Sequence, residues 1–122
     1  MMVGCRMSLE FSTRKMTFEG KEFNVALMEM ENAVLLLFWE GIRPLLGTLT
    51  VTLPGRISSQ LLGDRDALFG QILGEQLASY FQRMALVSVN LRTIRGETVG
   101  GRALELIKEI INERGKSRTQ SS

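Results

Sequence analysis

The chain contains no histidine and a single cysteine, Cys5. Without histidine the usual zinc sites cannot be built, and a lone cysteine cannot form a disulfide within the chain. No nucleophile, base and orienting group stand together in a recognisable catalytic motif. We therefore expect no catalytic residue, no metal site and no cofactor. The function is then expected to rest on surfaces that bind other proteins.

Long apolar runs are also missing. The longest uncharged apolar stretch, Ala33 to Trp39, is far shorter than the roughly 20 residues that span a bilayer. The first residues, Met1 to Arg6, contain no apolar block of the roughly 7 to 15 residues that a signal peptide needs. We therefore expect a cytoplasmic protein that does not contact a membrane.

The excess of basic charge is small and local. The net charge is +2, and residues 112–122 account for all of it with three basic residues and one acidic residue. Nucleic-acid binding normally needs a clustered basic face that neutralises phosphates. We therefore expect no nucleic-acid partner. Residues 115–122 have no apolar side chain, so a disordered basic tail is predicted there.

The 122 residues are enough for one domain, which we place at residues 8–114 after an N-terminal extension, residues 1–7. Hydrophobic patterning predicts two amphipathic helices, one from Leu68 to Phe81 and one from Thr98 to Ile111. It also predicts six strands, over Phe11 to Phe18, Phe23 to Met30, Ala33 to Glu40, Thr48 to Leu53, Arg56 to Leu62 and Met84 to Leu91. The fold class expected is α+β, an antiparallel sheet of about six strands with both helices packed on it.

Two of these strands suggest a surface for a second copy of the chain. The segment from Ala33 to Glu40 is almost continuously apolar, as expected of a central strand. The next strand alternates, with leucine and valine on one face and a polar stripe of threonines, open to water or a polar partner, on the other. Two helices cannot cover both faces of such a sheet, so one face or edge is a candidate dimer surface. Which face dimerises stays open, and the candidate interface residues are Leu35, Leu37, Trp39, Thr48, Thr50 and Thr52.

Two glycines, Gly70 and Gly74, lie inside the first predicted helix. Each costs roughly 1 kcal/mol relative to alanine in a helix interior. We therefore expect this helix to pack closely against a strand at both positions.

The segment from Gly96 to Ala103 imitates a phosphate-binding loop before a helix. Arg102 stands where that motif needs lysine, and Ala103 lacks the hydroxyl that would hold magnesium. A glycine-rich connection is the simpler interpretation, with nucleotide binding as the alternative. Similarly, Asp64 and Asp66 fit helix caps better than a metal site or an acid pair.

Four segments, in this order and spacing, resemble the proteasome assembly chaperone 3 and 4 family. They are a Gly-Thr-Leu strand opening, a Leu-Leu-Gly-Asp sequence before a helix, an aliphatic strand and a closing helix, at Gly47 to Leu49, Leu61 to Asp64, Ala85 to Leu91 and Gly101 to Ile111. Each motif is short and mostly structural. The resemblance rests on their joint order and covers most of the chain.

The resemblance implies a small α+β domain that dimerises through its sheet and assists assembly of the proteasome α-ring without catalysing a reaction. Because the chain shares features with both chaperones, it implies a homodimer where eukaryotes use a heterodimer, and an archaeal source fits. Family members contact proteasome α-subunits through a loop between strands, which corresponds here to Pro54 to Ser59. The partner-binding residues implied are Pro54, Gly55, Arg56, Ile57 and Ser58.

The alternative is a homodimeric adaptor or scaffold of the roadblock-like class, which also combines a sheet with helices on its faces. Its usual helix-first order does not fit the strand-like segments that open this chain.

Overall fold

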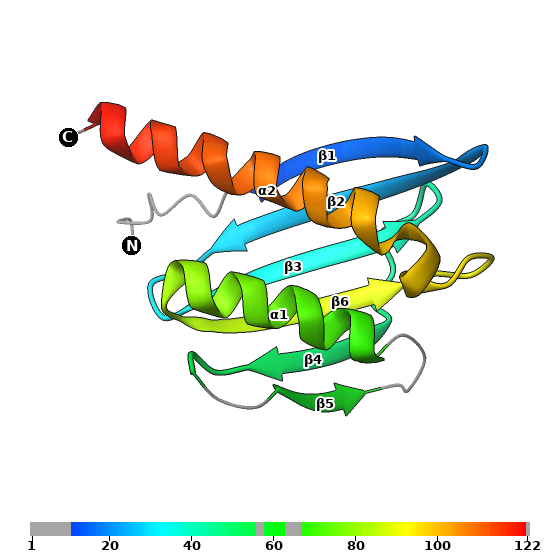
Figure 1. Cartoon of the computed structure of the whole chain (residues 1–122), viewed down its shortest axis with the longest axis horizontal. Helices are drawn as coiled ribbons and strands as arrows, with labels where there is room; N and C mark the ends of the chain where they lie inside the picture. The colour runs from blue at the N-terminus through cyan, green and yellow to red at the C-terminus, as the bar shows by residue number, and fades with distance from the viewer. Residues whose placement is uncertain (1–10, 56–57, 63–66, 122) are drawn as a thin grey trace, which may run out of the picture.

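The computed structural model describes residues 11–55, 58–62 and 67–121. Within them, five strands precede the first helix, and a sixth strand separates it from the second (Figure 1). The elements are β1 (Phe11–Phe18), β2 (Lys21–Glu29), β3 (Ala33–Glu40), β4 (Thr48–Thr52), β5 (Ser58–Leu62), α1 (Ala67–Phe81), β6 (Met84–Asn90) and α2 (Gly96–Ser121).

The six strands form one sheet in the order β1-β2-β3-β6-β4-β5. The hairpin between β1 and β2 turns through Glu19 and Gly20, which both have positive φ, as a two-residue hairpin turn requires. The predicted number of strands and helices is confirmed, but the sheet is mixed, because β3 and β6 run parallel. Parallel neighbours need a crossover, and α1 provides it by carrying the chain from the edge strand β5 back to β6.

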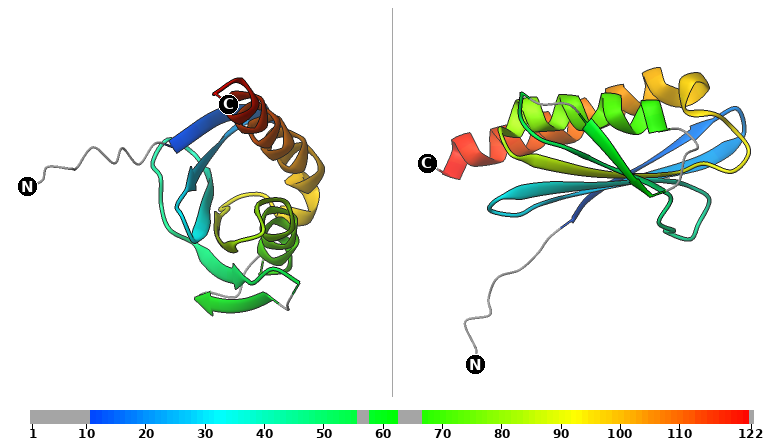
Figure 2. Two further views of the ribbon diagram at one scale, coloured as in Figure 1. Left: turned by 90° about the vertical axis from the view of Figure 1, so that its left-hand side faces the viewer. Right: turned by 90° about the horizontal axis from the view of Figure 1, so that it is seen from below.

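Both helices lie on the same face of the sheet (Figure 2). α1 packs on β4 and β6, and α2 crosses to β1. Between helices and sheet lies a single apolar core, whose largest fully buried side chains include Phe23, Phe38 and Leu73. No helix in the described ranges is both long and apolar enough to cross a membrane.

Helix α2 is longer than the sequence predicts. It begins at Gly96, two residues before the predicted start, and continues to Ser121. The prediction of a disordered tail over residues 115–122 is therefore wrong as far as Ser121. Local polarity cannot reveal that a helix already packed on a sheet continues past its last apolar residue.

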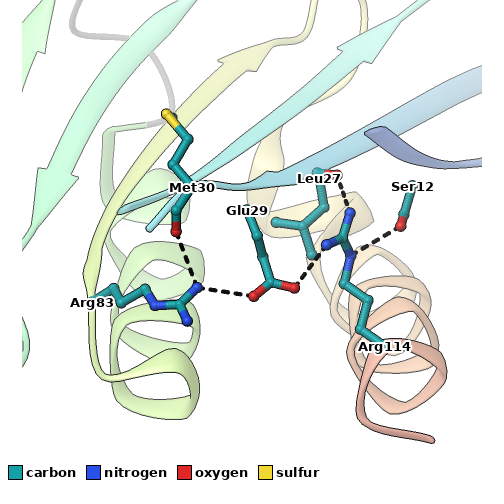
Figure 3. A network of polar contacts seen from close by, with 6 residues as sticks. All are labelled: Ser12, Leu27, Glu29, Met30, Arg83 and Arg114. Atoms are coloured by element: carbon teal, nitrogen blue, oxygen red, sulfur yellow. Dashed lines mark hydrogen bonds and ion pairs between the residues drawn. The ribbon is translucent and has the colours of Figure 1, made fainter. Parts of the chain in front are cut away.

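The carboxylate of Glu29, at the end of β2, joins both helical segments to the sheet (Figure 3). Its two oxygens accept hydrogen bonds from Arg83 Nη1 at 2.9 Å, just after α1, and from Arg114 Nη1 at 2.7 Å, in α2. Arg114 also donates to the Leu27 carbonyl at 2.9 Å and to Ser12 Oγ at 2.9 Å. All three charged side chains are partly buried, so these bonds are stronger than surface ion pairs. The bonds of Arg114 position α2 over β1 and β2.

Glu40 is the last residue of β3, at the other end of the sheet from Glu29, and it holds the connection from β6 to α2 in place. Its carboxylate accepts hydrogen bonds from the backbone N–H groups of Arg92 at 2.8 Å and Thr93 at 2.9 Å, and from the Thr93 hydroxyl. Burial of the carboxyl raises its pKa, but the hydrogen bonds from Thr93 and Arg92 and the charge of Lys21 outweigh this effect. The pKa of Glu40 therefore lies below the ordinary glutamate value.

Candidate interaction surface

The face of the sheet opposite the helices, which we call the open face, is covered by neither helix (Figure 2). Residues paired across strands point to the same side, so the register defines this face. Its first row reads Phe11, Met28, Leu35, Leu86 and Val51, from β1 to β4. The second row reads Thr13, Ala26, Leu37, Ser88 and Leu49.

The open face is partly accessible in the subunit: Ala26, Met28 and Ser88 are buried, but the large side chains of β3 and their neighbours are not. Leu35, Leu37, Trp39, Leu86 and Val51 all keep part of their surface accessible. A sheet that is apolar on both faces is stable in water when each face is covered. Within the described residues, helices cover one face only, so the open face has the character of an interface.

The structure brings three of the predicted dimer residues together on this face. Leu35, Leu37 and Trp39 are successive open-face positions of β3. Trp39 has a further feature, because its indole Nε1 is buried and finds no acceptor among the described residues. These positions stay candidates for the dimer interface.

The other three predicted dimer residues are misplaced, because the stripe of Thr48, Thr50 and Thr52 points under α1 and is buried. Thr50 and Thr52 are only 0% and 1% exposed. Within the subunit they cannot face a second copy. The predicted alternation in β4 is confirmed, but the threonines, and not the leucine and valine side chains, lie beneath α1.

The glycines of α1 explain this arrangement. A Cβ on Gly70 would lie 2.6 Å from Thr50 Oγ1, and a Cβ on Gly74 would overlap Thr52 Oγ1. The helix backbone approaches β4 so closely that only small side chains fit between them. The expected close packing at both glycines is thus confirmed. The larger Leu49 and Val51 take the open face instead.

Sequence reasoning missed several open-face residues, because it took the threonine stripe, and not the face of Leu49, Val51 and Leu53, as the side open to water or a partner. Leu53, which follows β4, is 46% exposed. The spacing of Gly70 and Gly74 carried a signal that could have found them. Two glycines one turn apart in a helix predict small side chains on the strand beneath, and hence large ones on its other face.

The loop implied as the partner-binding site follows β4. Pro54 is partly buried, and Gly55 is exposed with a φ of 67°. Ser58 begins β5, while Arg56 and Ile57 lie outside the described residues. Beside this loop, a shallow recess of about 360 Å³ lies between α1 and the end of β4, with Glu75, Ser79 and Gln82 among its lining residues.

The segment that imitates a phosphate loop has a structural explanation. Gly96 and Gly100 face the ring of Phe69 in α1, where a Cβ on Gly96 would approach ring carbons to 2.8 Å. The glycines therefore allow the two helices to meet. Asp64 and Asp66 lie outside the described residues. Within those residues, histidine, cysteine and acidic side chains form no group of three that could hold a metal ion.

Comparison with known proteins gives a fold but no sequence relative. No family model and no curated protein sequence matches the chain. The structure is similar to a crystal structure of a chaperone complex for assembly of the yeast 20S proteasome, with a TM-score of 0.64 and 12% sequence identity. The similarity covers 90% of this chain and 98% of the yeast chain. The two chains therefore share one α+β fold.

Proposed function

We propose that this protein is a non-catalytic chaperone that binds proteasome α-subunits and assists assembly of the 20S α-ring. The observation that carries the proposal is the open face, a largely uncharged apolar surface on a fold shared with a proteasome assembly chaperone. An exposed apolar surface of this kind marks a site where another protein binds. The α-subunits are the partners implied by the resemblance of the sequence to the chaperone 3 and 4 family.

We further propose that the protein acts as a cytoplasmic homodimer, without nucleic-acid or membrane partners. The dimer is placed on the open face, around Leu35, Leu37 and Trp39. We place the α-subunit contact at the loop from Pro54 to Ser58, which the resemblance implies. A homologue of archaeal type fits this arrangement, since one chain then provides both halves of the dimer.

Native mass spectrometry of the protein, alone and mixed with α-subunits of the same organism, tests the proposal. We expect a dimer that joins α-subunits in a complex of defined stoichiometry. A dimer that ignores every α-subunit would contradict the chaperone function, and the roadblock-like adaptor would then be tested next.

Reversal of one charge in the loop tests the α-subunit contact. Arg56→Glu is expected to weaken α-subunit binding about tenfold, because a charge reversal at an interface rim costs roughly 1 kcal/mol or more. The matched control is Arg102→Glu on the exposed side of α2, where the ion pair with Glu105, at 3.7 Å, is well exposed. If both variants weaken α-subunit binding equally, or if neither weakens it, the result would argue against a contact at the loop.

A further inference from the structure

The loop between β3 and β4, residues 41–47, presents exposed apolar side chains. Ile42 is 83% exposed, the highest value among the large apolar side chains of the described residues. Leu45 and Leu46 are exposed as well. The loop projects on the side of the sheet that faces away from the helices (Figure 2, right). It therefore stands at the rim of the open face.

This loop is held in place by polar side chains of the open face. Asn24 Nδ2 donates to the Gly41 carbonyl at 2.8 Å, and Asn90 Nδ2 donates to the Leu46 carbonyl at 3.2 Å. The N–H of Gly47 donates to Ser88 Oγ at 2.9 Å. Asn24 and Ser88 are buried, so their two bonds are partly shielded from water, whereas the bond from Asn90 is exposed. The exposure of Ile42 thus belongs to an anchored loop rather than to a frayed one.

The surface formed by the loop continues onto the sheet. A hollow of about 450 Å³ lies beside the loop, and Ile42, Trp39, Asn24 and Lys15 are among the residues that line it. The indole N–H of Trp39, which has no acceptor among the described residues, belongs to this region. The loop and the open face therefore form one surface, and a protein that binds the open face would contact both.

The charges on this surface suit a second copy of the chain. A two-fold interface brings the same patch of both copies together, so a patch of one charge sign would repel itself. The open-face positions of β3, β6 and β4 carry no charged side chain. The rim carries both signs, with Lys15 on β1, Glu22 on β2 and Arg43 on the loop. Two copies of this surface can therefore face each other without charge repulsion.

We propose that residues 41–47 form a ledge that packs on a second copy of this chain, with Ile42 and Leu46 as its contact residues. This inference rests on the proposed homodimer and assigns residues 41–47 to the contact between its two copies. Because the ledge projects beyond the sheet, it meets the facing subunit outside the sheet-to-sheet contact. It thereby limits how the two sheets slide over each other.

Sedimentation velocity over a dilution series, with Ile42→Asp and Leu68→Asp, tests this ledge. Both side chains are well exposed in the subunit, at 83% and 68%, so neither change should lower the melting temperature much. Leu68 lies on the helical layer and is the matched control. We expect Ile42→Asp to raise the dimer dissociation constant by about tenfold or more, since each dimer loses two apolar contacts. Leu68→Asp should leave it unchanged, and Leu46→Asp should repeat the effect of Ile42→Asp.

The outcomes separate the ledge from the proposed function. A wild-type protein that stays monomeric at every concentration would overturn both the homodimer and the ledge. A wild-type dimer that Ile42→Asp and Leu46→Asp do not weaken would overturn the ledge and leave the homodimer standing. Weaker α-subunit binding with an unchanged dimer would assign residues 41–47 to the α-subunit, and this too would overturn the ledge.

Discussion

Single buried carboxylates hold the long connections of this subunit in place. Glu29 ties Arg83, just after α1, and Arg114, within α2, to β2, and Glu40 ties the segment after β6 to the end of β3. Each accepts several hydrogen bonds at little exposure, which makes the bonds strong and their loss costly. The sequence alone does not reveal such roles, because a glutamate at the end of a strand is normally predicted to be exposed to solvent.

Glu40 should make stability depend on pH. Its pKa is lower in the folded protein than in the unfolded chain. Its contribution to the free energy of unfolding is therefore fully present above the pKa of glutamate in the unfolded chain, about 4.3. This contribution is lost as the pH falls through the lower pKa of the folded protein. Glu40→Gln removes the charge that the Thr93 and Arg92 donors stabilise. It should lower the free energy of unfolding by about 1.5 to 3 kcal/mol at neutral pH.

Urea denaturation of wild type and Glu40→Gln at several pH values measures this effect. The difference between them should shrink as the pH approaches 3. A difference that stays constant from neutral to acidic pH would mean that the charge of Glu40 contributes nothing.

At the level of elements, the type and order of helices and strands were predictable and the orientation of β4 was not. Period-two alternation distinguishes two faces of a strand without saying which one is inward. In β4 the decision lies with α1, whose glycines at 70 and 74 bring its backbone onto the threonines. The parallel pairing of β3 with β6 was also out of reach, because it depends on where the crossover through α1 inserts the last strand.

The contact between α1 and β4 should respond to a single methyl group. Gly74→Ala favours an isolated helix by about 1 kcal/mol, but here the new Cβ overlaps Thr52 Oγ1, so we expect a net loss of stability. Gly101→Ala in α2 is the control, because no atom lies within 4 Å of its Cβ position. It should stabilise the protein by about 0.5 to 1 kcal/mol.

Thermal denaturation followed by circular dichroism compares these two variants. Adding Thr52→Ala to Gly74→Ala should restore part of the lost stability. A stabilising Gly74→Ala would contradict the close contact between helix and strand.

For the whole molecule, the decisive feature is that, in the described residues, helices cover only one face of the sheet. The helical layer shields one face of the sheet and carries charged residues on its outer side, such as Arg102, Glu105 and Lys108. The open face is nearly uncharged and is completed by the loop at residues 41–47. The sequence predicted that one face would lack cover and identified Leu35, Leu37 and Trp39. It could not exclude the threonines, because the side covered by the helices depends on tertiary packing.

Trp39 allows a direct test, because it is the only tryptophan in the chain and lies on the open face. We would measure quenching of its fluorescence by acrylamide over a wide range of protein concentrations, with sedimentation velocity on the same samples. We expect quenching to decrease as the dimer forms, because the second copy then covers Trp39. A dimer in which Trp39 is quenched as strongly as in the monomer, or a protein that never dimerises, would contradict the open face as the interface.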